Sequence, residues 1–238
     1  ILGRRAGKSE VQSVVSRAKN AGINNISLDV MLGVPGQTKE SLKSTLDFCI
    51  SSGVPHLSCY ILKIEENTPF FRMRDKLPFP SDDDTADMYL FMCEYLEEHG
   101  IMQYEISNFA VPGFESRHNL KYWHDEEYLG IGASAHSFLG GKRTYYPRDI
   151  EYFISGNERL TEGDGGDEEE FCMLALRLRE GLTQERFYAR FHHEIPQKML
   201  ESAKQYEKYG LCRCESGGIS LTRRGFLLSN SVISEIIL

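Results

Sequence analysis

Apolar residues follow two different periods along the first part of the chain. Between Val11 and Ala18 they recur at helical spacing, and Gly22 follows as a helix terminator. Residues 26–32 and 56–62 have the pattern of strands, and residues 39–51 between them have a helical apolar face. Strands and helices that alternate at such short intervals predict an α/β fold with parallel strands and crossover helices.

The pattern changes in the second half of the chain. Residues 127–135 have a strand-like pattern, and residues 147–155 have a helical one. From Asp167 onward, three helical segments precede a glycine-tipped hairpin and a final helix. This order predicts a small α-rich, winged-helix-like module at the end of the chain. We therefore expect two domains, residues 1–162 and residues 163–238.

The composition limits the classes of function. The chain has 238 residues, 41% of them hydrophobic, and a formal net charge of −8. No apolar run approaches the roughly 18 residues that a membrane-spanning helix needs. After residue 166 the chain has ten Lys and Arg against eleven Asp and Glu, so the final module lacks the basic surface that nucleic-acid binding requires. Scattered cysteines and the absence of a signal peptide indicate a reducing, cytoplasmic compartment.

The segment Tyr104–Trp123 concentrates residues that can hold a flat metal-containing ligand. It includes the only tryptophan, four other aromatic residues and His118, whose imidazole can ligate iron. A helix would place His118 and Tyr122 on one face. Arg117 and Lys121 can pair with carboxylates of a ligand. The alternative interpretation is a core in which the tryptophan and tyrosine pack, with a histidine on the surface beside them.

The order of residues within this segment carries a resemblance. The run His118-Asn119-Leu120-Lys121-Tyr122-Trp123 resembles the H-N-x-x-Y-W motif of the heme-chaperone (HemW-like) branch of the oxygen-independent coproporphyrinogen III oxidase (HemN-like) family. That family belongs to the radical S-adenosylmethionine (SAM) proteins. Further segments resemble the same family in the expected order, namely Ile26–Leu42, His56–Phe70, Tyr128–Phe138 and Leu221–Asn230.

The resemblance implies a fold and a set of ligands. It implies that residues 1–162 are part of an incomplete radical SAM βα-barrel. Heme would bind at His118, as the ligand to the metal, and at Asn119, Tyr122 and Trp123. SAM would contact Arg4 and Asp29, where a guanidinium can pair with the methionine carboxylate and a carboxylate can accept from ribose hydroxyls. Asp29 could instead bond to a neighbouring loop.

The cysteines do not fit an iron–sulfur site. Radical SAM proteins hold a [4Fe–4S] cluster with a C-x3-C-x2-C loop, and no three cysteines here have that spacing. The six are Cys49, Cys59, Cys93, Cys172, Cys212 and Cys214. We therefore expect this chain to be the C-terminal part of a longer protein, and to be inactive as an enzyme alone.

A second segment also has the residues of a ligand site. Gly130–Ala135 fits G-x-G-x-x-A, but a dinucleotide site needs a helix after this motif, and the residues that follow read as a strand and a turn. We expect the small residues to let the backbone approach a ligand closely. His136, directly after them, is a second histidine that can face a cofactor.

Three functions remain open at this point. The first is the C-terminal part of a heme-trafficking protein, whose partners are heme or porphyrin and a heme-acceptor protein. The second is a coproporphyrinogen III oxidase that decarboxylates propionates with SAM and the cluster. The third is a docking fragment without a cofactor. An open barrel exposes strand edges, so dimerisation by edge pairing is a further expectation.

Overall fold

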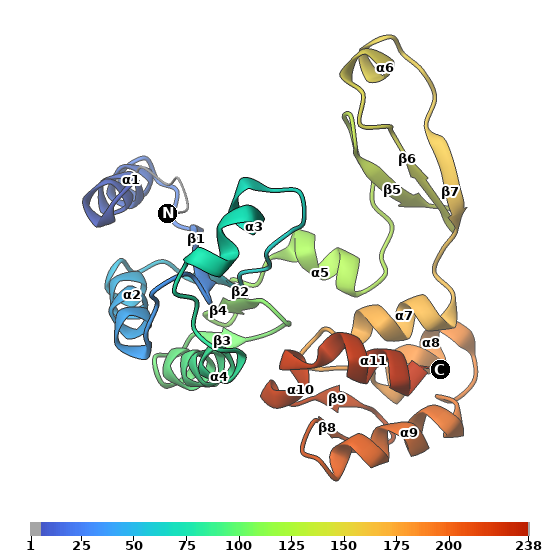
Figure 1. Cartoon of the computed structure of the whole chain (residues 1–238). Coiled ribbons are helices and arrows are strands. Elements are labelled where there is room, and N and C mark those ends of the chain that lie inside the picture. The colour runs from blue at the N-terminus through green and yellow to red at the C-terminus, as the bar shows by residue number, and fades with distance from the viewer. Residues whose placement is uncertain (1–5, 238) are drawn as a thin grey trace. The chain divides into compact units, whose positions relative to one another are not determined.

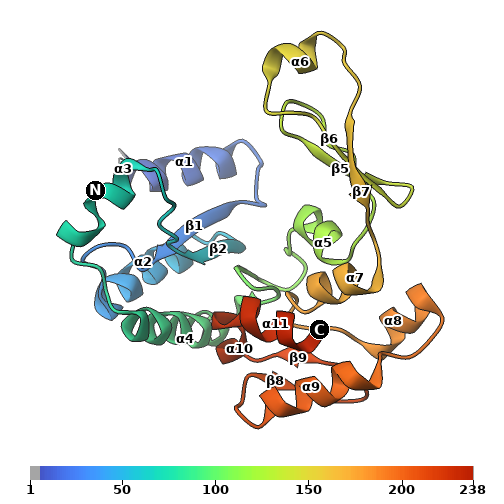
Figure 2. The same cartoon turned by 45° about the vertical axis from the view of Figure 1, so that its right-hand side comes forward.

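The computed structural model describes residues 6–237, which fall into two compact units that divide between Glu115 and Ser116. Arg4, one of the two residues expected at SAM, lies outside the described residues. Each unit has its own helices, and the described residues form one sheet in the first unit and two in the second (Figures 1 and 2). The expected domain boundary at residues 162 and 163 stays a prediction. Among residues 6–237, no helix combines the length and apolar character that crossing a membrane requires.

The first unit is a four-stranded sheet with helices. Its elements are α1 (Lys8–Asn20), β1 (Ser27–Leu32), α2 (Lys39–Ser51), β2 (His56–Ile61), α3 (Pro69–Met73), the 3-10 helix η1 (Arg74–Lys76), α4 (Asp82–Glu98), β3 (Met102–Gln103) and β4 (Asn108–Ala110). The strand order is β1-β2-β4-β3. β1 and β2 are parallel, as predicted, whereas β4 is antiparallel to both β2 and β3. The prediction of parallel strands is therefore wrong for β4. After α4 the chain forms the short strand β3 and then reverses direction, so that β4 enters the sheet beside β2 in the antiparallel sense.

The two faces of this sheet differ in burial. Val30 and Leu32 of β1 are buried, as are Leu57 and Cys59 of β2. α2 and α4 both contact β1, and α4 begins at the capping residue Ser81. Side chains alternate across a strand, so residues between the buried ones belong to the opposite face. That opposite face is more exposed and carries polar side chains.

The second unit combines a hairpin sheet with a helical module. Its elements are α5 (Arg117–Trp123), β5 (His136–Leu139), β6 (Lys142–Tyr145), α6 (Ile150–Ile154), β7 (Leu160–Asp164), α7 (Glu168–Ala175), α8 (Gln184–Phe191), α9 (Gln197–Glu207), β8 (Cys212–Arg213), β9 (Ser220–Leu221), α10 (Arg223–Leu227) and α11 (Ser229–Ile237). In Figures 1 and 2, β5, β6 and β7 form an arm with α6 at its tip. The helices and antiparallel hairpin after Asp167 agree with the predicted winged-helix-like module.

The segment before β5 differs from its prediction. Residues 127–135 are not a strand, and only Tyr128 forms a bridge, to Phe138. The Cβ atom of a side chain at Gly130 would overlap the carbonyl oxygen of His136. The expected close backbone approach therefore exists, but it is made to the chain's own strand β5. The predicted helix over residues 147–155 is confirmed only for α6, and β7 was not predicted.

A network of charges around the buried Asp125 joins α7, α8 and β6 to the turn after α5. Asp125 follows α5, and its side chain is 1% exposed. It lies 3.2 Å from Arg143 of β6 and 3.4 Å from Arg190 of α8. Arg143 also lies 2.7 Å from Glu170 of α7. Burial, followed by the nearby Glu170 carboxylate, raises the pKa of Asp125 to about 6, and the two arginines oppose that shift.

The raised pKa of Asp125 predicts a dependence of stability on pH. Between pH about 4 and 6 the folded chain binds this proton and the unfolded chain does not, so the contribution of Asp125 to the unfolding free energy falls as pH rises. Asp125→Asn removes the titration. We expect the stability of the variant, relative to the wild type, to rise by up to about 3 kcal/mol from pH 4 to pH 6.5. Urea denaturation of both proteins across this range measures the difference, and a constant difference would contradict the assignment.

The close approach at Gly130 predicts a second effect on stability. Gly130→Ala should lower the unfolding free energy by about 2 kcal/mol or more, because the methyl group overlaps the carbonyl of His136. Gly163→Ala is the matched control, since no atom lies within 4 Å of its added Cβ atom. Urea denaturation compares the two variants. Equal stability of both would show that the segment before β5 can move away without cost.

Candidate functional site

α5 is a short helix that begins at a capping serine. The Ser116 hydroxyl accepts a hydrogen bond from the backbone amide of Asn119 at 3.4 Å. This cap satisfies a backbone donor that the helix itself leaves unpaired. Lys121 pairs with Glu126 at 2.8 Å, beyond the end of the helix. The H-N-x-x-Y-W run is therefore helical, the conformation that would place His118 and Tyr122 on one face.

The helix brings His118 and Tyr122 together. The Tyr122 hydroxyl lies 3.1 Å from Nε2 of His118. Their rings are perpendicular, with centroids 5.0 Å apart, and Tyr122 also meets the ring of Tyr128 at 4.5 Å. His118 itself is exposed. The side chain that can ligate iron is thus oriented by an aromatic neighbour and remains accessible to a ligand.

The side chains of Trp123 and Asn119 have different surroundings within the second unit. Both side chains are half-buried. The guanidinium of Arg177 lies 5.8 Å from the centroid of the indole ring. The indole Nε1 of Trp123 is buried and has no hydrogen-bond partner within residues 6–237. A buried N–H without an acceptor costs stability, so a ligand that supplies an acceptor fits here.

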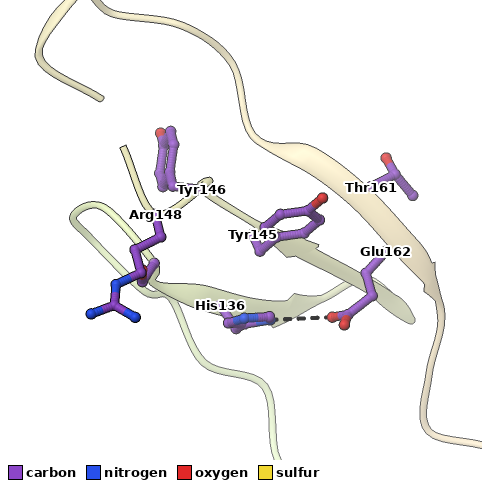
Figure 3. A pocket seen from close by; sticks show the side chains of 7 residues that line it. His136, Tyr145, Tyr146, Arg148, Thr161 and Glu162 are labelled. Carbon is purple, nitrogen blue, oxygen red and sulfur yellow. Dashed lines mark hydrogen bonds and ion pairs between the residues drawn. The ribbon is translucent and has the colours of Figure 1, made fainter. Parts of the chain in front are cut away.

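His136 forms a separate group on the arm. Its Nδ1 lies 3.2 Å from a carboxylate oxygen of Glu162 on β7, and its ring stacks on Tyr145 of β6 at 5.4 Å (Figure 3). These side chains line a hollow of ≈ 470 Å³. Among the described residues no hydrogen bond or ring contact joins His118 to His136. Sequence analysis identified the histidine but missed Tyr145 and Glu162, because only strand register brings these three residues together.

Asp29 belongs to the exposed face of the first sheet. It is the third of six residues of β1 and pairs in register with Ser58 of β2. Asp29 therefore lies within the strand and not at its end, because β1 continues to Leu32. Burial lowers the pKa of the neighbouring His56, and the Asp29 carboxylate opposes this shift. An exposed carboxylate on a polar sheet face has the chemistry to accept from hydroxyl groups of a ligand.

Known proteins resemble this chain in sequence and in fold. Residues 168–228 match the family model of the HemN C-terminal domain. The chain is 34% identical to the heme chaperone HemW of Bacillus subtilis (strain 168), over 99% of this chain and 65% of that protein. It is also 34% identical to the heme chaperone HemW of Lactococcus lactis subsp. lactis (strain IL1403), over 100% of this chain and 65% of that protein.

The fold is similar to a solved radical SAM enzyme. The coproporphyrinogen III oxidase HemN from Escherichia coli matches 99% of this chain and 60% of its own, with a TM-score of 0.76 and 18% sequence identity. The chain spans about 65% of the length of the two HemW relatives above. Motifs, sequence relatives and fold thus agree, and the chain belongs to the family that contains the HemW heme chaperones and the HemN coproporphyrinogen III oxidase.

Proposed function

We propose that the chain is the heme-binding part of a HemW-like heme-trafficking protein. The observation that carries this proposal is the pairing of His118 with Tyr122 on the exposed face of α5, at 3.1 Å. Relatives that are 34% identical to the chain are named heme chaperones. In the intact protein, heme would be held at α5 and delivered to an acceptor protein in the cytoplasm.

Each residue of the run has a distinct part in this proposal. Bound heme would supply an iron that takes an imidazole nitrogen, and His118 is the ligand. Tyr122 orients the imidazole through its hydroxyl and its ring edge. Trp123 offers an apolar ring surface and a buried N–H donor. Asn119 supplies a half-buried amide that can bond to the ligand.

SAM and a [4Fe–4S] cluster belong to the same proposal, in the intact protein only. Asp29 has the exposed polar position that a ribose contact needs. Arg4 is proposed for the methionine carboxylate on the family resemblance alone. The cluster would be bound by cysteines outside this chain. Dimerisation through an exposed strand edge also remains a proposal.

A coproporphyrinogen III oxidase is the second candidate function. The fold match to HemN and the match of residues 168–228 to the HemN C-terminal domain favour it. The H-N-x-x-Y-W run favours the chaperone, because it resembles the motif of that branch. A docking fragment without any cofactor is the third candidate, and only the near-balanced charge of the final module supports it.

Titration with hemin tests the heme site at α5. We expect a Soret shift on binding, and His118→Ala should weaken binding most because it removes the ligand to the iron. Trp123→Ala should weaken binding by roughly 2 kcal/mol through lost apolar contact. The double variant Arg117→Ala with Lys121→Ala should have the smallest effect, because exposed ion pairs contribute little. Absorbance titration at fixed pH gives the three affinities.

A control histidine distinguishes ligation of the heme iron by His118 from nonspecific adhesion of hemin to the protein. His99 is exposed in the first unit, at the end of α4, and His99→Ala should leave hemin affinity unchanged. If His118→Ala binds hemin as tightly as the wild type and His99→Ala do, the ligation claim is wrong. His118 and Asn119 would then be a structural part of α5.

Reconstitution with iron and sulfide tests the origin of the cluster. No group of three His, Cys, Asp or Glu side chains that could hold a metal ion is present in residues 6–237. We therefore expect no [4Fe–4S] absorption after anaerobic reconstitution of this chain, because such clusters need cysteine thiolates close together. A stoichiometric iron–sulfur spectrum would contradict the proposal that the cluster ligands lie outside the chain.

A further inference from the structure

Two cysteines share one face of the hairpin in the helical module. Cys212 of β8 is 2% exposed, Arg213 is exposed, and Cys214 is half-buried. Because side chains alternate across a strand, Cys212 and Cys214 lie on the same side. Both thiols are free, and their side chains are in hydrogen-bond contact with each other. The hairpin thus joins them into a dithiol that none of the proposed functions uses.

The helix α9 covers one thiol of this pair and leaves the other accessible. The Cys212 thiol donates a hydrogen bond to the carbonyl oxygen of Ala203, with 2.9 Å between sulfur and oxygen. The backbone amide of Cys214 donates to a carboxylate oxygen of Glu207 at 2.8 Å, which holds the end of β8 against α9. The side chain of Cys214 remains partly exposed. A small ion can therefore reach the dithiol from the side of Cys214.

The spacing of the two cysteines suits a bridging ion better than a disulfide. Residues two positions apart in an extended strand are separated by about 6.7 Å on the same face. A disulfide needs Cβ atoms only about 3.8 Å apart, so it would distort β8, whose Cys212 and Arg213 pair with β9. A metal ion between the sulfurs adds two bonds of roughly 2.3 Å each and spans the larger separation without moving the strand.

The number of ligands decides which ion fits. Thiolates select soft ions, namely Cu(I), zinc and the iron of iron–sulfur clusters. Structural zinc takes four protein ligands, and iron–sulfur clusters need further cysteines close by. Within residues 6–237 no third His, Cys, Asp or Glu side chain completes a group that could hold such a metal. Cu(I) forms linear complexes with two thiolates, so it is the ion that a dithiol alone satisfies.

The surroundings of the two thiols give metal binding a characteristic pH dependence. Burial, followed by the neighbouring Cys214 thiol, raises the pKa of Cys212 to about 12. Burial, followed by the Glu207 carboxylate, raises the pKa of Cys214, and Lys204 opposes that shift. A metal binds thiolates, so loading the pair releases two protons. The affinity therefore rises with pH by up to about a hundredfold per pH unit, which is tenfold for each proton.

We propose that Cys212 and Cys214 form a binding site for one Cu(I) ion, which bridges the two sulfurs at the end of β8. The ion replaces the two thiol protons, which pass to the solvent, and no electron is transferred. Binding removes the hydrogen bond from the Cys212 thiol to Ala203 and crosslinks the strand end. The site goes beyond the proposed heme function and shares no residue with α5.

Competition with a Cu(I) chelator tests this site on the whole chain. Under anaerobic conditions and with glutathione in excess, the wild type should take one Cu(I) ion from bathocuproine disulfonate. Cys214→Ser and Cys212→Ala should each lose about a hundredfold in affinity or more, because a single thiol forms no bridge. Cys172→Ala is the matched control, since Cys172 is a buried cysteine of the same unit, and it should bind Cu(I) as the wild type does.

Two further measurements distinguish a bridged ion from copper on scattered thiols. X-ray absorption of the loaded chain should show two sulfur ligands, and the affinity should rise with pH more steeply in the wild type than in Cys214→Ser. Equal affinity of the wild type and Cys214→Ser would overturn the proposal, even if Cys212→Ala fails to fold. Weaker binding in Cys172→Ala as well would also overturn it, as would a wild type that leaves the copper with the chelator.

Discussion

The second unit depends on the buried carboxylate of Asp125. This residue lies two positions after the helix that carries the proposed heme ligand, and it is held by Arg143 and Arg190 from β6 and α8. Arg143 in turn pairs with Glu170 and covers the ring of Phe138 at 4.5 Å. A buried carboxylate without these partners would be strongly destabilising. The network therefore fixes where α5 ends relative to the arm and the helices of the same unit.

The two histidines of this unit have partners of different kinds. His118 depends on Tyr122, four residues away on the same helix, so its environment forms locally. His136 depends on Glu162, which is far away in sequence and reaches it only through the bulge in β7. A tyrosine hydroxyl can give its hydrogen bond to a nitrogen that iron would need, whereas a carboxylate on Nδ1 leaves Nε2 accessible.

The first unit shows how a sheet with one covered face provides a polar surface. α2 and α4 bury the side of β1 that carries Val30 and Leu32. Asp29 directly precedes the buried Val30 and therefore belongs to the other side, where it pairs in register with Ser58. His56, at the start of β2, bonds to Ser27 at 2.7 Å and is buried. The exposed polar side chains of this face therefore include Ser27 and Asp29, whereas the imidazole of His56 is covered.

The sequence by itself determined the local elements and the helical site. Apolar periodicity predicted α2 and the strands β1 and β2, and a spacing of four residues implied that His118 and Tyr122 would share a face of any helix formed there, because these features depend only on neighbouring residues. Only the tertiary structure decided the antiparallel β4, the turn before β5 and the partner of His136. Strand order, register and bulges depend on distant residues, and a hydrophobic pattern does not encode which distant residue becomes the partner.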